Sequence, residues 1–160
     1  MPFTYTLIKS QTPKYHYSVK KSNPTGFFFS KKQPLREVEE VLIYYKKAGT
    51  YNPQMIGDVI RHMPKTTGNC GQNYYNGRNK PQPAKTYKGY FPTTLLHNNL
   101  KRRGGKSVCD ELITYFIKTY SNENDTILDM TCCNDVVGNL CKELKRNFIG
   151  IDINLKDELL

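Results

Sequence analysis

The chain lacks three features that would each place it in a well-defined class of protein. It has no tryptophan, no apolar run near the ~20 residues that a membrane span needs, and no pair of cysteines spaced as CxxC. Its first residues, MPFTYTLIKS, also lack the apolar centre of a signal peptide. We therefore expect a soluble protein inside the cell, in the cytoplasm or nucleus of a host, with no membrane span.

The few cysteines are expected to be reduced, mostly buried thiols. They stand at positions 70, 109, 132, 133 and 141 and do not have the spacing of a zinc site. A strained disulfide or a metal contact at the adjacent Cys132 and Cys133 is the less favoured alternative. We predict no metal site.

Acidic residues are scarce relative to basic ones, with 14 Asp and Glu against 24 Lys and Arg and a net charge of +10. Such an excess favours an anionic partner, most often nucleic acid, although solubility alone also produces basic surfaces. The excess is concentrated in residues 59–109, which contain no aspartate or glutamate and carry a charge equal to that of the whole chain. The candidate contacts to nucleic acid or another partner are Arg61, Lys65, Arg78, Lys80, Lys85, Lys88, Lys101, Arg102, Arg103 and Lys106.

The same segment has glycine, proline and asparagine scattered through it, with tyrosines and a phenylalanine between the cations. This composition predicts little regular structure, in an extended loop or a small insertion. Two interpretations stay open. The cations and rings contact phosphates and bases, or the segment is a solvated loop or a strap over protein neighbours.

The apolar pattern between residues 126 and 152 predicts a strand, a crossover helix and a second strand parallel to the first. The strands are Thr126–Asp129 and Phe148–Asp152, and apolar residues recur at helical spacing from Val136 to Leu144. In nucleotide-binding units of this layout, the first turn carries glycines so that the backbone can approach the ligand at the helix N-terminus. Here that turn, residues 130–135, reads MTCCND and contains no glycine.

Apolar patterns in two other regions predict secondary structure. An apolar stripe predicts a helix over Ser107–Tyr120 with Ser107 as its N-cap. Residues 1–47 are expected to contribute strands, because Tyr15 and its neighbours alternate with polar residues and Val41–Tyr45 is a β-rich run. The tyrosines there are interpreted as sheet packing rather than base stacking. The glutamates at positions 37, 39 and 40 are assigned to a short helical turn begun by Pro34.

The unit at 126–152 resembles the cofactor half of the β-type amino-methyltransferases of DNA, which modify adenine N6 or cytosine N4. The family's glycine-serine-glycine falls on Cys133, Asn134 and Asp135. A second match lies upstream, where Pro24–Phe27, Lys31–Arg36, Val41–Lys46 and Thr50–Gln54 resemble the family's PTGF element and the segment after it. The ungapped matches in the first unit are Leu128, Asp129, Gly138, Cys141, Lys142, Leu144, Phe148, Ile149, Gly150 and Ile151.

The resemblance implies an α/β fold. We expect a partial Rossmann-like methyltransferase fold with a mixed or parallel sheet and a basic, irregular insertion. The predicted regions are N-terminal strands at 1–58, the insertion at 59–106 in the position of the family's target-recognition region, and a helix with the degenerate cofactor unit at 107–160.

The resemblance also shows which of the family's catalytic and cofactor-binding sequence motifs the chain lacks. The family's catalytic tetrapeptide, Asp-Pro-Pro-Tyr or a variant such as Asn-Pro-Pro-Tyr, precedes the PTGF element, and neither form occurs here. That tetrapeptide accepts hydrogen bonds from the target amino group and stacks the flipped base. The family's HPTQKP element, which helps close over the cofactor, has only a loose counterpart around Lys106. We predict no catalytic residues.

The family's cofactor is S-adenosylmethionine, and Asp129, Asp135 and Asp152 are the residues that would contact it. Asp152 would hold the ribose hydroxyls, whereas Asp129 could equally accept hydrogen bonds from loop amides. Asp135 can cap the following helix, but its carboxylate stands where the charge of the cofactor would come. Cys133 adds a side chain where glycine allowed close approach. We therefore predict that the cofactor is not bound.

The sequence thus predicts a catalytically inactive, methyltransferase-derived basic protein that serves as a scaffold or interaction component with other protein subunits. We expect a sheet edge or apolar face to be left uncovered for them. The abundance of lysine, asparagine, isoleucine and tyrosine suggests an AT-rich genome, such as that of a large DNA virus or phage, and a place in the virion. The alternatives are one half of a split DNA methyltransferase, whose second chain supplies the tetrapeptide, and a simple nucleic-acid-binding module.

Overall fold

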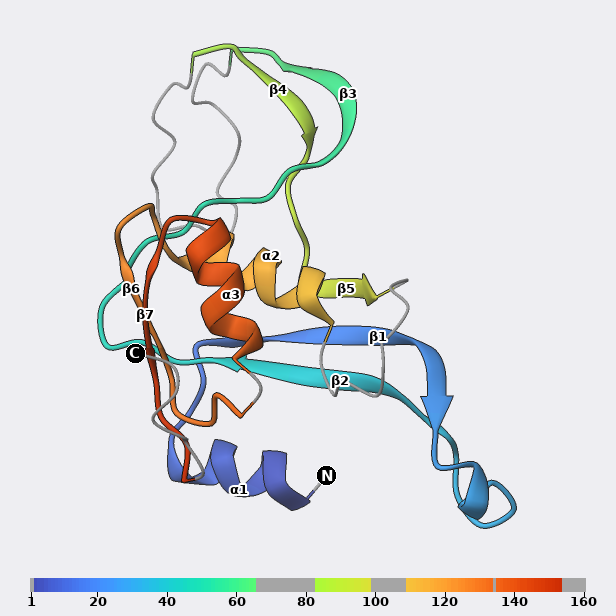
Figure 1. Cartoon of the computed structure of the whole chain (residues 1–160). Helices are drawn as coiled ribbons and strands as arrows, with labels where there is room; N and C mark the ends of the chain where they lie inside the picture. The colour runs from blue at the N-terminus through green and yellow to red at the C-terminus, as the bar shows by residue number, and fades with distance from the viewer. Residues whose placement is uncertain (1, 66–82, 99–108, 134, 154–160) are drawn as a thin grey trace. The chain divides into compact units, whose positions relative to one another are not determined.

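The computed structural model describes residues 2–65, 83–98, 109–133 and 135–153. The chain forms two compact units, one of Met1–Asn52 with Thr93–Leu160 and one of Pro53–Pro92. The elements, labelled in Figure 1, are α1 (Pro2–Ser10), β1 (Tyr15–Thr25), a 3₁₀ turn η1 (Phe27–Phe29), β2 (Arg36–Ile43), β3 (Ile56–Met63), β4 (Lys85–Tyr90), β5 (Leu95–Asn98), α2 (Asp110–Tyr120), β6 (Thr126–Asp129), α3 (Val136–Glu143) and β7 (Asn147–Gly150). The fold is therefore mixed α/β with small sheets.

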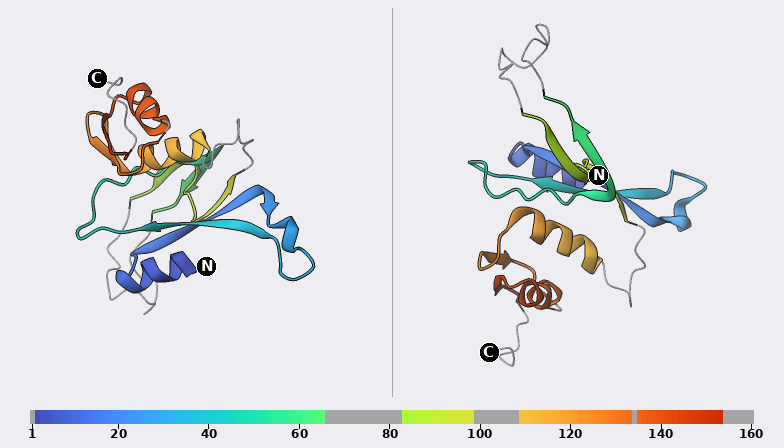
Figure 2. Two further views of the ribbon diagram at one scale, coloured as in Figure 1. Left: turned by 60° about the horizontal axis from the view of Figure 1, so that its bottom comes forward. Right: turned by 90° about the horizontal axis from the view of Figure 1, so that it is seen from above.

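The first unit contains a three-stranded sheet in the order β2-β1-β5, with β1 antiparallel to β2 and parallel to β5. Along β1, Tyr17, Val19 and Lys21 are buried while their neighbours are more exposed. This alternation turns one face of the strand towards α2, where the rings of Tyr17 and Phe116 lie 5.3 Å apart. The views in Figure 2 place α1 on the other side of β1 and β2 from α2.

The first unit also contains the predicted strand-helix-strand element. Strands β6 and β7 are parallel, in a register that runs from Thr126 opposite Asn147 to Asp129 opposite Gly150. The crossover helix α3 packs against β7 and α2, and its Cys141 is fully buried. The prediction of a parallel pair joined by a helix is confirmed, with β7 ending at Gly150 rather than Asp152.

The predicted helix that precedes this element is confirmed from Asp110 to Tyr120. Its N-cap position is Cys109, and Ser107 lies outside the described residues. No helix of the described part of the chain is long and apolar enough to cross a membrane.

The first 47 residues contribute the strands β1 and β2, as predicted, and residues 2–10 add the helix α1. One prediction for this region is wrong. The glutamates after Pro34 lie in β2, not in a helical turn, because this segment pairs with β1, whose lysines form ion pairs with two of them. Lys20 Nζ lies 3.3 Å from Glu37 and Lys21 Nζ lies 3.7 Å from Glu39, so opposite charges meet across the two strands.

The second unit has more regular structure than its composition predicts. Strands β3 and β4 form an antiparallel pair in which Ile60 lies opposite Lys88 and Met63 opposite Lys85. The strands approach closely at Gly89, whose φ is 86° and whose missing Cβ would lie 2.7 Å from the carbonyl oxygen of Gly57. Glycine is therefore required there for strand contact and does not mark a loop.

Candidate functional site

The turn between β6 and α3 is the part of the molecule where the sequence predicts a cofactor site. Two of its residues have a left-handed backbone, Cys133 with a φ of 35° and Asp135 with a φ of 51°. These are the positions on which the resemblance places the family's two glycines. The left-handed conformation costs a residue other than glycine roughly 1–2 kcal/mol, and somewhat less for aspartate. The turn thus keeps a glycine-type conformation without glycine.

Hydrogen bonds hold this turn against the ends of β6 and β7. Asp129 Oδ1 accepts from the amide of Thr131 at 2.9 Å, and Asp152 Oδ2 accepts from the amide of Cys133 at 3.0 Å. The amide of Cys132 donates to the carbonyl of Ile151 at 3.1 Å. Asp129 and Asp152 therefore both act as acceptors for loop amides in this arrangement.

Two glycines beside the turn leave space that its side chains fill. A Cβ on Gly138 would overlap the carboxylate of Asp135, and a Cβ on Gly150 would lie 2.9 Å from the thiol sulfur of Cys132. Asp135 occupies the N-cap position of α3, but its side chain makes no capping hydrogen bond. The predicted side-chain cap is wrong because the left-handed backbone of Asp135 differs from the extended conformation that an N-cap side chain normally requires. The carboxylate lies instead beside Gly138.

Three carboxylates in and beside the turn act on the pKa of one thiol. Desolvation raises the pKa of Cys132, and the negative charges of Asp152, Asp129 and Asp135 raise this pKa further. All three predicted cofactor residues are therefore brought together within electrostatic range of Cys132. The turn therefore carries an acidic cluster, and two of its carboxylates accept hydrogen bonds from amides of the turn.

The basic residues predicted to contact a partner are only partly described. Arg61 lies in β3, Lys85 and Lys88 lie in β4, and Lys65 follows β3. Lys88 pairs with Asp58 at 2.9 Å. This acid stands one residue before the acid-free segment, so the basic residues predicted from the sequence have a counter-charge that the segment itself does not contain. The predicted residues Arg78, Lys80, Lys101, Arg102, Arg103 and Lys106 lie outside the described residues.

The cations of the second unit alternate with aromatic rings. The guanidinium of Arg61 lies 4.7 Å from the centre of the Tyr90 ring, and the rings of Tyr87 and Phe91 lie 5.1 Å apart. Both strands are largely exposed. The β3–β4 hairpin thus presents cations and aromatic rings together, which is the composition of a nucleic-acid contact surface.

Comparison with known proteins decides the family. The model described as DNA methylase, for N6 and N4 methyltransferases, matches residues 7–157. The chain belongs to this family. A search of the curated proteins finds no match.

Two solved structures are similar to this DNA methylase chain. The crystal structure of the M1.HpyAVI-SAM complex matches with 20% identity and a TM-score of 0.53, over 94% of this chain and 63% of that one. The crystal structure of M1.HpyAVI matches with 20% identity and a TM-score of 0.49, over 94% and 60%. The first match shows a shared fold, and the chain spans less than two thirds of the length of either protein.

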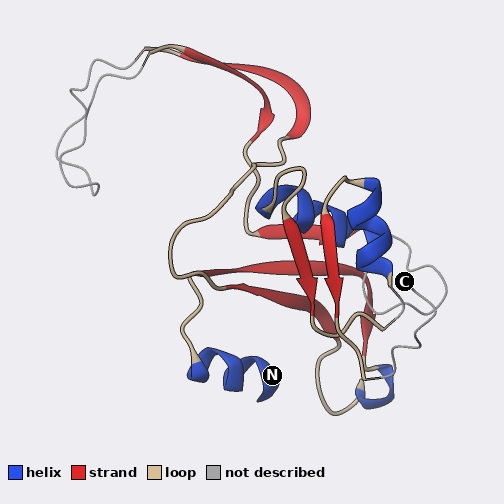
Figure 3. Cartoon of the chain, turned by 60° about the vertical axis from the view of Figure 1, so that its left-hand side comes forward, coloured by secondary structure: helices blue, strands red, loops and turns tan. Residues whose placement is uncertain are grey.

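The two-stranded sheet of this methylase domain has an uncovered apolar face. Its exposed residues are Leu128 on β6 and Ile149 on β7, which lie opposite each other and are 54% and 53% exposed, together with Met130, Ile151 and Ile153. We call these five residues the open face. Helix α3 packs on the sheet through the alternate residues, with Phe148 against Gly138, and the two strands are drawn side by side in Figure 3. Parallel strands in proteins are usually buried on both faces.

The core between β1 and α2 contains a tyrosine cluster that sequence patterns did not reveal. The hydroxyl of Tyr120 lies 2.8 Å from that of Tyr15 and 2.9 Å from that of Tyr17. Burial is the main cause that raises the pKa of Tyr120, and these hydrogen bonds raise it further. Burial also raises the pKa of Tyr115, to about 12. The burial of Tyr17 agrees with the packing interpretation of the tyrosines on β1.

Proposed function

We propose that this chain is a non-catalytic member of the DNA methylase family that serves as a scaffold or interaction component, attached to another protein through its open face. The absence of both tetrapeptide forms from the 160 residues supports the first part. Without an acceptor for the target amino group and a ring for the flipped base, the described residues offer no means of activating the nitrogen.

The arrangement of the β6–α3 turn supports the absence of cofactor binding. A bound S-adenosylmethionine would have to share the carboxylate of Asp152 with the amide of Cys133, which one oxygen of that group accepts. The thiol of Cys132 and the carboxylate of Asp135 fill the space beside Gly150 and Gly138. The turn residues in this arrangement do not fit the cofactor, and the proposal contains no methyl-transfer step.

The open face supports attachment to a protein. Five exposed apolar side chains on a two-stranded parallel sheet form a surface that water solvates poorly, and such surfaces mark protein contacts. Strand β6 pairs with β7 alone among the described strands, so its other edge is also open to strand addition. A partner that supplies further strands or helices would match both features.

The assignment of the mixed α/β fold to a Rossmann-like methyltransferase fold is part of the same proposal. We propose that the sheet β2-β1-β5 and the sheet β6-β7 are parts of one Rossmann-like methyltransferase sheet, which the partner completes. In support, the chain spans 63% of the M1.HpyAVI chain whose fold it shares. The lysine-, asparagine- and tyrosine-rich composition is the ground for proposing a viral or phage particle as the setting.

Light scattering of the purified chain, alone and in its native assembly after cross-linking, tests the attachment. We expect Leu128→Lys with Ile149→Lys to remove the protein contact. The matched control, Val59→Lys with Ile60→Lys, changes exposed apolar residues of β3 and should leave that contact intact. A wild-type chain that stays monomeric, with no partner cross-linked to the open face, would refute attachment through this surface.

Transfer of labelled methyl groups from S-adenosylmethionine to mixed-sequence DNA tests the lack of catalysis. We expect no incorporation above a no-protein control. Incorporation that is lost on mutation of Asp129 or Asp152 would overturn the proposal.

A split methyltransferase is the second candidate, and the left-handed backbone at Cys133 and Asp135 favours it. This conformation is the one that two glycines would adopt without strain. Saturable binding of S-adenosylmethionine by the wild-type chain at micromolar concentration, measured by calorimetry, would support the split enzyme and count against the non-catalytic scaffold.

A nucleic-acid-binding module is the third candidate, supported by the cations and rings of the β3–β4 hairpin. Changing Lys101, Arg102 and Arg103 to glutamate should weaken binding to all DNA sequences alike if the basic segment binds phosphates. If the segment is a strap over protein neighbours, the same change should spare DNA binding and disrupt assembly.

A further inference from the structure

The tip of the β1–β2 hairpin exposes three consecutive phenylalanines, Phe27, Phe28 and Phe29. The ring of Phe28 is 91% exposed. Burying such a side chain is worth roughly 1.5–3 kcal/mol, so a run of three exposed rings is a feature that folding of this chain does not explain. We call residues 26–32 the phenylalanine tip.

The tip is an ordered turn. The amide of Phe29 donates to the carbonyl of Gly26 at 2.9 Å, and the amide of Ser30 donates to that of Phe27 at 3.0 Å. The amide of Lys32 donates to the carbonyl of Phe29 at 2.8 Å. The rings of Phe28 and Phe29 lie edge to face, with their centres 5.0 Å apart. The backbone of the turn is therefore fixed by hydrogen bonds before any partner binds, and two of the rings contact each other.

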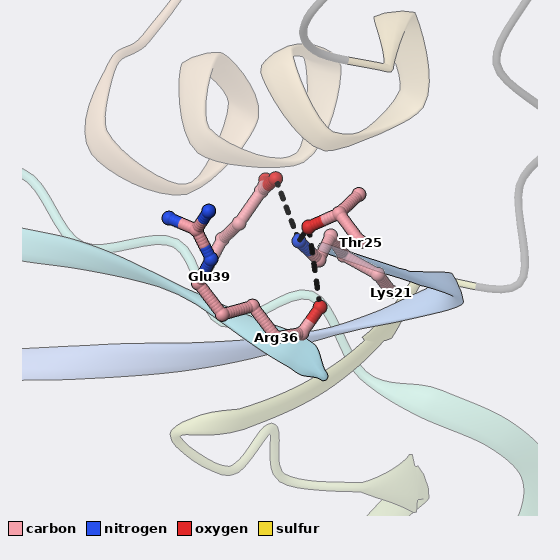
Figure 4. A network of polar contacts seen from close by, with 4 residues as sticks. All are labelled: Lys21, Thr25, Arg36 and Glu39. Carbon is pink, nitrogen blue, oxygen red and sulfur yellow. Dashed lines mark hydrogen bonds and ion pairs between the residues drawn. The ribbon is translucent and has the colours of Figure 1, made fainter. Parts of the chain in front are cut away.

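A polar network fixes the base of the tip to both strands, as Figure 4 shows. The buried Lys21 donates from Nζ to Thr25 Oγ1 at 3.0 Å and pairs with Glu39 at 3.7 Å. Thr25 Oγ1 in turn donates to the carbonyl of Arg36 at 3.4 Å. The network spans the register shift between Lys20 and Thr25. Its hydrogen bonds and ion pair therefore connect the two strands where regular strand pairing is interrupted.

The sequence that contains the exposed rings is basic. Residues 22–36 include Lys31, Lys32 and Arg36 and contain no aspartate or glutamate. Arg36 Nε lies 4.0 Å from the position of a Cβ on Gly26, so its side chain borders the tip. Aromatic rings with cations and no acid are complementary to a partner that has flat apolar faces and negative charge.

We propose that the phenylalanine tip binds unpaired bases of a nucleic-acid strand. The ring of Phe28 stacks a base, and Lys31 and Lys32 neutralise the adjacent phosphates. The edge-to-face arrangement leaves an open ring face for this contact. This site lies in the first unit and uses none of the basic residues that the sequence predicts between 59 and 109, and its function does not depend on attachment through the open face.

Fluorescence anisotropy with labelled oligo(dT) and oligo(U) measures the binding, and the two strands distinguish DNA from RNA. Phe28→Ala should weaken binding by roughly fivefold or more, since one base–ring stack contributes about 1–3 kcal/mol. The matched control is Phe3→Ala, which removes a 74% exposed ring from α1 and should leave affinity unchanged. Unchanged melting temperatures would show that both variants remain folded.

The salt dependence tests the cations. Changing both Lys31 and Lys32 to glutamate should flatten the plot of log affinity against log salt concentration by roughly 0.7 for each lost phosphate contact. Lys46→Glu with Lys47→Glu makes the same charge change in exposed residues beyond β2 and should reduce the slope less.

Equal affinity of wild type and Phe28→Ala for both oligonucleotides would overturn the proposal. If Phe28→Ala then abolished binding to vesicles of anionic phospholipid, the tip would be assigned to a membrane surface instead.

Discussion

Two turns of this protein need a left-handed backbone, and they meet that need in different ways. At the hairpin tip, Gly26 has a φ of 97°, and the turn directs its phenylalanines into solvent. In the β6–α3 turn, Cys133 and Asp135 adopt positive φ without glycine, and the side chains of Cys132 and Asp135 fill the space beside nearby glycines. One turn presents its aromatic side chains to solvent, while amides of the other donate to the carboxylates that flank it.

Our proposals assign a ligand contact to the first turn and none to the second. A loop that binds an anion through its amides needs those amides free, and the amide of Cys133 is engaged by Asp152. The backbone conformation of a former glycine loop can outlast its glycines, because hydrogen bonds to Asp129 and Asp152 continue to hold it. This turn of a methylase domain thus keeps a glycine-type backbone although its sequence contains no glycine.

The largest expected effect is at the tip. Gly26→Ala places a Cβ at a φ of 97° and should destabilise the protein by roughly 1–2 kcal/mol. Gly49→Ala is the control, because a Cβ there meets nothing within 4 Å and the φ is not positive. Urea denaturation measures both. Equal stability of the two variants would contradict the claim that the tip needs its glycine.

The opposite change in the other turn should stabilise the protein. Cys133→Gly relieves a left-handed backbone and should raise the free energy of unfolding by roughly 0.5–1 kcal/mol. Asp135→Gly should give a smaller gain, because aspartate tolerates this conformation better than cysteine. The same denaturation assay ranks them. A loss of stability in Cys133→Gly would show that the turn is not strained.

Melting temperatures measured over a series of alkaline pH values test the core between β1 and α2, which contains neither turn. The pKa of Tyr115 is raised from 10.0 to about 12 in the folded protein. The stability that this shift contributes is therefore fully present below pH 10 and is lost as the pH rises towards 12. Tyr115→Phe should reduce the fall in melting temperature above pH 10, whereas Tyr5→Phe, at an exposed position of α1, should not. An unchanged profile in Tyr115→Phe would assign the loss elsewhere.

The smallest effect concerns the charge of the closed turn. Asp152→Asn removes a negative charge that raises the pKa of Cys132, so at mildly alkaline pH more of this thiol should be ionised and alkylation should be faster. The measurement is made in a Cys133→Gly background, so that the exposed neighbour does not react. Glu143→Gln, a charge change on the exposed end of α3, is the control. Equal rates would mean that Asp152 does not act on the thiol.

Several helices and strands could be predicted from patterns in short stretches of the sequence. The β6-α3-β7 unit follows from apolar spacing within 25 consecutive residues, 126–150, and helix α2 follows from its own stripe. The two matches to the methylase family are also contiguous stretches of chain. The ungapped alignment even marks Cys133 and Asp135 as the glycine positions, although it could not show that the backbone there remains left-handed.

Only the tertiary structure decided the features that depend on distant residues. The glutamates of β2 are in a strand because this segment pairs with β1, whose Lys20 and Lys21 form ion pairs with Glu37 and Glu39. Gly89 marks a strand because Gly57 lies against it. The open face could be assigned only once α3 was seen to cover the alternate residues. The exposure of Phe28, and the network that fixes its turn, likewise depend on the pairing of β1 with β2. Periodicity records which residues can share a face, whereas the partner of each face is set by contacts between segments far apart in the chain.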